Sequence, residues 1–173
     1  VLKIFDIVRT MTNGNFGTGS VVPWDTPYDI TWQINGGVFE FIRPGTPNVP
    51  AGVVLQHTFQ AVPANQLMTA AFKLGNSSGV RKRVTVLLHD FDFSDLSACT
   101  FWLPPGQELR SYTMRSYATE AWGDATLSVY AASAGVDQWM RLDDAAMYKT
   151  PATSMVGTEC VEPLPDVIAA SIP

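Results

Sequence analysis

The fold of this chain is decided by a stretch near its C-terminal end, Gln138-Trp139-Met140-Arg141-Leu142-Asp143-Asp144-Ala145-Ala146-Met147-Tyr148. It predicts a long closing strand in which an acidic pair is set among apolar residues. Side chains alternate along a strand, so Asp143 shares a face with Trp139 and Arg141, and Asp144 shares the other face with Met140 and Leu142. A buried carboxylate is costly unless paired. The aspartates therefore need hydrogen bonds, a cation or water.

Short segments with a period of two recur along the rest of the chain, separated by turns rich in glycine, proline and asparagine. The clearest is a hairpin of residues 30–34 and 38–42, joined by Asn35-Gly36-Gly37. No segment keeps helical spacing of apolar residues beyond two turns. We predict an all-β fold, an antiparallel two-sheet β-sandwich of jelly-roll type with about ten strands. The other expected strands are 1–8, 53–60, 67–74, 80–89, 99–103, 108–117, 125–132 and 138–148.

Length and composition favour one domain with a substantial core. The chain has 173 residues, of which 46% are hydrophobic and 16% charged. We expect residues 1–150 to form the sandwich and residues 151–173 to form a tail or linker containing Pro, Thr and Ser. The net charge of −5 argues against a nucleic-acid partner, and the basic run Arg81-Lys82-Arg83 is typical of a solvated strand entrance. No apolar run approaches the roughly 20 residues of a membrane helix, so we expect no membrane insertion.

The two cysteines, Cys99 and Cys160, leave two alternatives open. A disulfide between them would close a loop of about sixty residues and pin part of the tail to the sandwich. Alternatively, both are buried free thiols of an intracellular protein. The low lysine content and abundant Thr, Ser, Asn and Gly favour the disulfide and an extracellular or cell-surface location. The chain shows no signal peptide, so as a secreted protein it is expected to be a mature or excised segment.

Several short motifs follow one another in a recognisable order: Asn13-Gly14-x-Phe16, Leu55-Gln56, and Trp139-x-Arg141-Leu142-Asp143-Asp144-Ala145. This order resembles the galactose-binding-like jelly roll, as found in the family-4 and family-22 carbohydrate-binding modules. The resemblance covers roughly residues 10–150. It implies a two-sheet sandwich, an extracellular setting and a polysaccharide or glycan ligand.

The same resemblance implies a structural Ca²⁺ near the first loop. Asn13 and Asp143 match the positions of this site, although Gly17 stands where the family places a glutamate. Calcium takes six to eight oxygen ligands, so backbone carbonyls of the glycine loop would complete the set. The alternative is that Asp143 accepts hydrogen bonds from backbone amides of that loop without a metal.

Aromatic residues in loops are the candidates for sugar binding, because a sugar ring stacks on an exposed aromatic face surrounded by polar groups. Trp24 and Tyr28 lie in a proline-rich loop, and Trp122 lies in a turn. We expect these three to form the carbohydrate-binding platform. The strand tryptophans are expected in the core, namely Trp32, Trp102 and Trp139.

Catalysis has little support in the sequence. The run from His89 to Asp95 contains an Asp-x-Asp pair, Asp90 and Asp92, which suits either a cation or acid–base site or a solvated turn, and the turn is favoured. His57 lies in an expected strand and is interpreted as structural. No Gly-x-Ser-x-Gly elbow accompanies the two histidines. A glycan-active enzyme using Asp90, Asp92 or Glu120 is a minor alternative.

Three hypotheses from different classes follow. The first is a non-catalytic extracellular carbohydrate-binding module of a larger secreted or surface protein. The second is a structural or adhesive subunit of a filament or surface layer, which would contact neighbouring copies through its apolar terminal segments 1–8 and 167–172. The third is the glycan-active enzyme. We favour the first.

Overall fold

The computed structural model describes residues 11–164 of the 173-residue chain. Two sequence predictions, the strand at 1–8 and the apolar segment at 167–172, lie outside the described residues. Within residues 11–164 no helix is long and apolar enough to cross a membrane.

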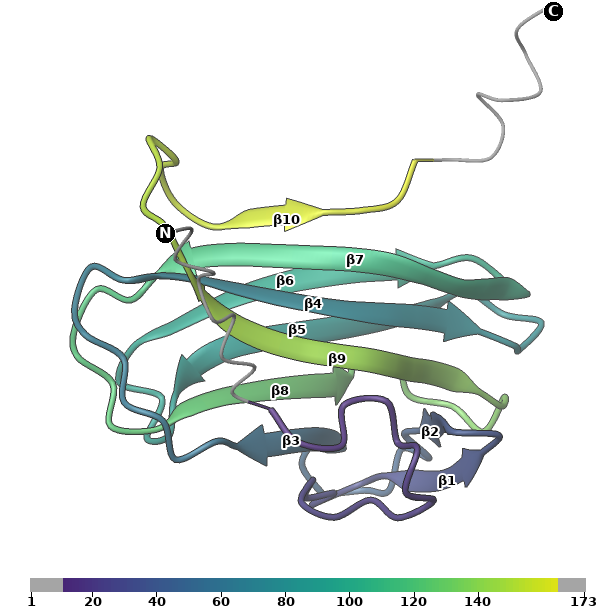
Figure 1. The fold of residues 1–173 in the computed structure, drawn as a ribbon. Coiled ribbons are helices and arrows are strands. Elements are labelled where there is room, and N and C mark those ends of the chain that lie inside the picture. The colour runs from purple at the N-terminus through teal and green to yellow at the C-terminus, as the bar shows by residue number, and fades with distance from the viewer. Residues whose placement is uncertain (1–10, 165–173) are drawn as a thin grey trace, which may run out of the picture.

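The described residues form ten strands in two antiparallel sheets that pack face to face, as Figure 1 shows. This confirms the predicted all-β sandwich. The six-stranded sheet has the order β1 (Thr31–Asn35), β2 (Val38–Ile42), β9 (Met140–Thr150), β4 (Leu67–Asn76), β7 (Gln107–Tyr117) and β10 (Glu159–Val161). The four-stranded sheet has the order β3 (Val53–His57), β8 (Ala125–Ala131), β5 (Lys82–Asp90) and β6 (Leu96–Leu103).

The core lies between the sheets and follows the period of two in each strand. On β5, Val84, Val86 and Leu88 are fully buried between the sheets, and on β8 Leu127 and Val129 are too. Burying one such side chain contributes about 1.5–3 kcal/mol. The alternate residues of these strands point away from the core, so the outer face of the four-stranded sheet is built from the intervening positions.

The closing strand β9 contains a β-bulge at Asp144. Its register against β4 shifts between Ala71↔Ala146 and Lys73↔Asp143, and Asp144 has a φ of 46°. One extra residue therefore resets the alternation. The expectation that Asp144 shares the buried face of Leu142 is wrong, because the bulge turns its carboxylate toward solvent, 2.9 Å from the Lys73 ammonium.

Beyond the bulge, β9 holds the first described loop. The amide of Ala145 donates a 2.9 Å hydrogen bond to the carbonyl of Gly14. The closing strand thus fastens the first loop, as expected. The contact runs through the Ala145 backbone, whereas a carboxylate oxygen of Asp143 accepts the amide of Asp144.

The predicted disulfide is present and joins the end of the described chain to the sandwich. Cys99 on β6 is bonded to Cys160 on β10, with 5.7 Å between their Cα atoms. β10 also pairs with β7, where Cys160 lies opposite Met114. Part of the segment expected to form a tail is therefore a sixth strand of the larger sheet.

Candidate ligand groove on the four-stranded sheet

The outer face of the four-stranded sheet carries a hollow of about 740 Å³. Its floor comes from outward-facing positions of three neighbouring strands: Leu55 and His57 on β3, Tyr130 on β8 and His89 on β5. His57 and His89 both pair with Thr126, so the two imidazoles belong to one row across the sheet. We call this space the central hollow.

Exposed aromatic rings from two loops form the walls of the central hollow. Tyr28, with 61% of its surface exposed, comes from the segment before β1, and Phe91 and Phe93 come from the turn between β5 and β6. The Tyr28 segment is held to the sheet by reciprocal backbone hydrogen bonds of 2.8 and 2.9 Å between Asp25 and Leu55. The Phe91 turn is closed by the amide of Phe93, which donates to the Asp90 carbonyl at 3.0 Å.

The two histidines are fixed by hydrogen bonds and by rings packed on them. His89 Nδ1 lies 2.6 Å from the Asp90 carbonyl and therefore donates, which leaves Nε2 to accept from the Ser128 hydroxyl at 2.8 Å. Phe93 stacks on His89 at 4.2 Å between ring centroids. Burial lowers the pKa of His89, so this ring is neutral at physiological pH.

His57, the other histidine of the floor, is held by different partners. Its Nδ1 lies 3.0 Å from the Thr126 hydroxyl and 3.5 Å from an Asp124 carboxylate oxygen. Phe91 packs on this ring at 4.8 Å between centroids. These contacts fix the His57 ring in the floor of the hollow, in agreement with its interpretation as a structural histidine.

Two smaller hollows of about 370 Å³ each extend the central hollow along the strands. The first shares Phe91 with it and includes Asp90, Asp92 and Asp124, and we call it the acidic end. The second shares Tyr130 with it and includes Arg43 and Arg83, and we call it the basic end. Because each smaller hollow shares a lining residue with the central hollow, we refer to the three together as the groove, which has carboxylates at one end and guanidinium groups at the other.

The structure buries two of the three predicted platform residues. Trp24 and Trp122 are each only 3% exposed, so the expectation that they are exposed is wrong. Trp24 donates its indole N–H to the Asn13 carbonyl at 3.0 Å, and Trp122 donates to Asp95 Oδ2 at 2.8 Å. Both rings reach from their loops into the hydrophobic core. Only Tyr28 of the predicted three lines the groove.

The expectation that Trp32 and Trp102 lie in the core is wrong. They are 37% and 46% exposed, and Trp102 faces outward because its neighbours on β6, Phe101 and Leu103, point into the core. Trp139 is half-buried. Tyr130 lies between the core residues Val129 and Ala131 on β8, so its ring points outward. That alternation was the signal for an outward ring. Phe91 was noted only as part of the acidic run.

The aspartates of that run support the turn. Asp90 Oδ1 accepts the amides of Phe91 and Asp124 at 2.9 and 3.1 Å, and Asp92 Oδ1 accepts the amide of Ser94 at 3.0 Å. Hydrogen bonding by Ser94 lowers the pKa of Asp92. Both carboxylates thus cap backbone amides, as the turn interpretation predicts.

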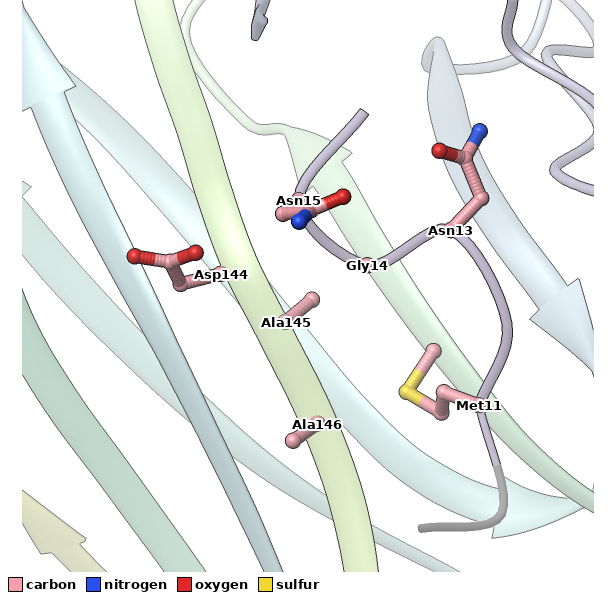
Figure 2. A pocket seen from close by; sticks show the side chains of 7 residues that line it. All are labelled: Met11, Asn13, Gly14, Asn15, Asp144, Ala145 and Ala146. Atoms are coloured by element: carbon pink, nitrogen blue, oxygen red, sulfur yellow. The ribbon is translucent and has the colours of Figure 1, made fainter. Parts of the chain in front are cut away.

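The predicted calcium ligands do not converge on one hollow. Asn13 lines a hollow between the first loop and β9, whereas Asp143 is not among its lining residues. Figure 2 shows the Asn13 side chain pointing away from β9 and the Asp144 carboxylate leaving the other side of that strand. Burial raises the pKa of Asp143.

One observation still favours a cation at Asn13. Its amide nitrogen donates to the carbonyls of Ser20 and Val22, while its Oδ1 is buried without a hydrogen-bond partner in the described part of the chain. Among residues 11–164, however, no group of three or more His, Cys, Asp or Glu is placed to hold a metal. Calcium binding at Asn13 and Asp143 therefore stays a prediction.

Solved structures with a similar fold include several carbohydrate-binding modules. A family-4 module matches with a TM-score of 0.58 and 13% identity, over 80% of this chain and 99% of that one. The CBM22-1 xylan-binding domain from Paenibacillus barcinonensis Xyn10C matches with a TM-score of 0.59 and 11% identity, over 81% and 94%. No protein-family model and no curated protein matches the chain.

Other matches are parts of much longer enzymes. The chain covers 22% of the enzymatically active domain of tailspike protein 4 from bacteriophage CBA120, with a TM-score of 0.62, 11% identity and 83% of this chain aligned. It covers 26% of an α-L-arabinofuranosidase, MgGH51, with the same TM-score and identity. At these identities the matches show the fold, which is the one that the sequence resemblance implied.

Proposed function

We propose that this protein is a non-catalytic carbohydrate-binding module of a larger extracellular protein, and that it binds a polysaccharide chain in the groove of the four-stranded sheet. The observation that carries the proposal is the pair of exposed rings, Tyr28 and Phe91, beside a floor that bears His57 and Tyr130. A sugar ring has an apolar face for stacking and hydroxyls for hydrogen bonds, and this groove offers both kinds of surface.

The open, elongated form of the groove supports a polymer rather than a small ligand. The central hollow shares Phe91 with a second hollow and Tyr130 with a third, and we propose that the chain lies across all three. The likeness to modules such as the xylan-binding domain of Xyn10C is in keeping with such a ligand.

Binding without catalysis is supported by the way the groove carboxylates are used. Glycosidases need one carboxyl group as an acid and another as a base or nucleophile. Here Asp90 caps two backbone amides, and Asp124 Oδ1 accepts the amide of Phe59 at 2.8 Å. Both act as structural acceptors in the loops that shape the groove.

An extracellular location is supported by the disulfide. A bond between Cys99 and Cys160 persists in oxidising surroundings and is rare in the cytosol. The chain spans only about a quarter of the enzymes it matches, so a place as one module of a longer secreted polypeptide forms part of the proposal.

Affinity electrophoresis tests the proposal. Gels that contain single soluble polysaccharides of plant, algal and microbial origin should retard the protein for at least one polymer. The Tyr28→Ala and Phe91→Ala variants should lose the retardation, whereas Trp32→Ala, which removes an exposed ring at the edge of the other sheet, should keep it. If no polymer retards the wild-type protein, the proposal fails.

A further inference from the structure

The basic end of the groove has a chemistry of its own. Arg43 and Arg83 line it together with Thr85, Leu87 and Tyr130, and the lining includes no acidic side chain. The whole chain carries a net charge of −5. The charge at this end of the groove is therefore the reverse of the charge of the molecule.

The Arg83 side chain is oriented by stacking, and its guanidinium is not neutralised by a carboxylate within residues 11–164. Its guanidinium carbon lies 5.3 Å from the ring centroid of Trp102, on which Arg81 also stacks at 4.0 Å. The amide of Arg83 donates to the Ser133 hydroxyl at 2.7 Å, which fixes the backbone. Within residues 11–164 neither Arg81 nor Arg83 forms an ion pair with a carboxylate. Stacking on an indole orients a guanidinium and leaves its N–H donors available.

Arg43 is oriented by Asp29, whose carboxylate already accepts three other hydrogen bonds. Its Nε lies 3.8 Å from Asp29 Oδ2, and the Asp29 carboxylate already accepts the amides of Gly45 and Thr46 and the Thr46 hydroxyl at 2.7–2.9 Å. Asp29 thus positions the Arg43 side chain beside the groove. A guanidinium pairs best with a carboxylate or similar oxyanion, through two parallel hydrogen bonds.

We propose that the groove selects a polysaccharide that carries anionic groups, a uronic-acid carboxylate or a sulfate, and that Arg83 with Arg43 binds the anion at the basic end. This inference rests on the proposed function. The aromatic walls stack on the sugar rings. The arginines bind the acidic sugar and thereby fix the orientation of the polysaccharide chain along the groove.

The other end of the groove limits the density of charge on the ligand. Asp90, Asp92 and Asp124 at the acidic end repel a second anion. The ligand is therefore a largely neutral backbone with sparse acidic sugars, and a polymer charged at every residue binds more weakly. The same argument disfavours nucleic acid, whose phosphates are evenly spaced.

Matched pairs of polysaccharides test the inference. Glucuronoxylan is compared with its carboxyl-reduced form, and a partly sulfated galactan with its desulfated form, by affinity electrophoresis and calorimetry. The protein should bind the charged member of at least one pair about tenfold more tightly, as expected for one charge-assisted hydrogen-bonded pair. The pair that shows the preference identifies carboxylate or sulfate as the anion.

Variants assign the preference to the basic end. Arg83→Gln should bring the affinity for the charged polymer down to that for its neutral partner, and Arg81→Gln should weaken the preference by loosening the stack on Trp102. Lys149→Gln, which removes an exposed cation of β9 on the other sheet, should leave the preference unchanged. Salt at about 0.5 M should reduce the preference by screening.

The outcomes separate this inference from the proposed function. Equal binding of both members of every retained pair, or a preference that survives Arg83→Gln, overturns the inference and leaves glycan binding standing. No binding of any member, charged or neutral, overturns the inference, and no binding of any polymer in the wider panel overturns both.

Discussion

The amide of Ala145 on β9 donates a 2.9 Å hydrogen bond to the carbonyl of Gly14, and this contact ties the first described loop to the closing strand. The bulge at Asp144 makes the contact possible, because it turns the Ala145 side chain into the core and presents its backbone to the loop. The loop in turn carries Phe16, which is fully buried and packs against Trp24.

Replacing Gly14 tests this connection. A Cβ at position 14 would clash with the Ala145 carbonyl oxygen, which is backbone and cannot move aside cheaply. Gly14→Ala should therefore lower the free energy of unfolding by about 1–3 kcal/mol. Urea denaturation measures the loss. Gly79→Ala is the matched control, because a Cβ there meets nothing within 4 Å, and equal stability of the two variants would contradict the account.

Removing the disulfide should cost more. The bond spans 61 residues, and loop-closure entropy predicts a loss of about 4 kcal/mol. Cys160→Ser is the suitable variant, because Cys160 is exposed whereas Cys99 is buried. Denaturation with and without a reducing agent checks the cause: reduction should destabilise the wild type toward the variant and leave the variant unchanged. A variant as stable as the oxidised wild type would contradict the prediction.

Asp95 should make the stability depend on acid. Burial raises the pKa of this carboxyl, but hydrogen bonds from the Trp122 indole and from the amides of Thr119 and Glu120 outweigh that effect, so its pKa lies below the ordinary value. Since the folded pKa is depressed, the stabilisation is present above the unfolded pKa of about 3.9 and is lost as the pH falls through the folded value.

The variant Asp95→Asn should accordingly show a smaller loss of unfolding free energy than the wild type when the pH is lowered below about 4. Thermal unfolding at a series of pH values gives the comparison. Asp137→Asn, at an exposed aspartate, should follow the wild-type profile. If the unfolding free energies of Asp95→Asn and the wild type fall equally with decreasing pH, Asp95 does not cause the acid dependence of stability.

Calcium should act through Asn13 if the resemblance extends to its metal site. The buried Oδ1 of Asn13 has no partner within the described residues, and a cation would satisfy it. Added Ca²⁺ should then raise the melting temperature of chelator-treated protein, by an amount equivalent to about 2.7 kcal/mol at a hundredfold excess over Kd. Asn13→Ala should lose this response.

Asp143→Asn tests the second predicted ligand in the same assay. Because Asp143 does not line the hollow that Asn13 lines, the response should persist in this variant. Its loss would make Asp143 a ligand after all. A wild-type protein whose melting temperature is the same with calcium and with chelator would end the calcium prediction.

The sequence predicted the strands because their period of two and their Gly and Pro turns are local signals, as the hairpin of β1 and β2 shows. It also predicted the disulfide and the meeting of the closing strand with the first loop. It failed at Asp144, because one extra residue in a strand leaves no mark in a pattern of apolar residues. A strict alternation through this strand places Asp144 on the face of Leu142, whereas the bulge turns it to solvent.

The groove was harder to predict because exposure of a ring depends on what packs over it. Trp24 and Trp122 lie in loops, yet both rings are part of the core. Tyr130 and His89 lie in strands, yet both line the groove, His89 beneath the ring of Phe93. Strand order decides which outward residues become neighbours, and β3, β8 and β5 are distant in sequence.

The position of a bound glycan tests the central claim most directly. A polysaccharide fragment that the electrophoresis identifies as a ligand is titrated into ¹⁵N-labelled protein, and amide chemical shifts are followed by NMR. The account predicts that the largest shifts occur at Tyr28, Phe91 and Tyr130 and their neighbours on β3, β5 and β8. Shifts confined to the six-stranded sheet, or to the loop that carries Trp122, would contradict it.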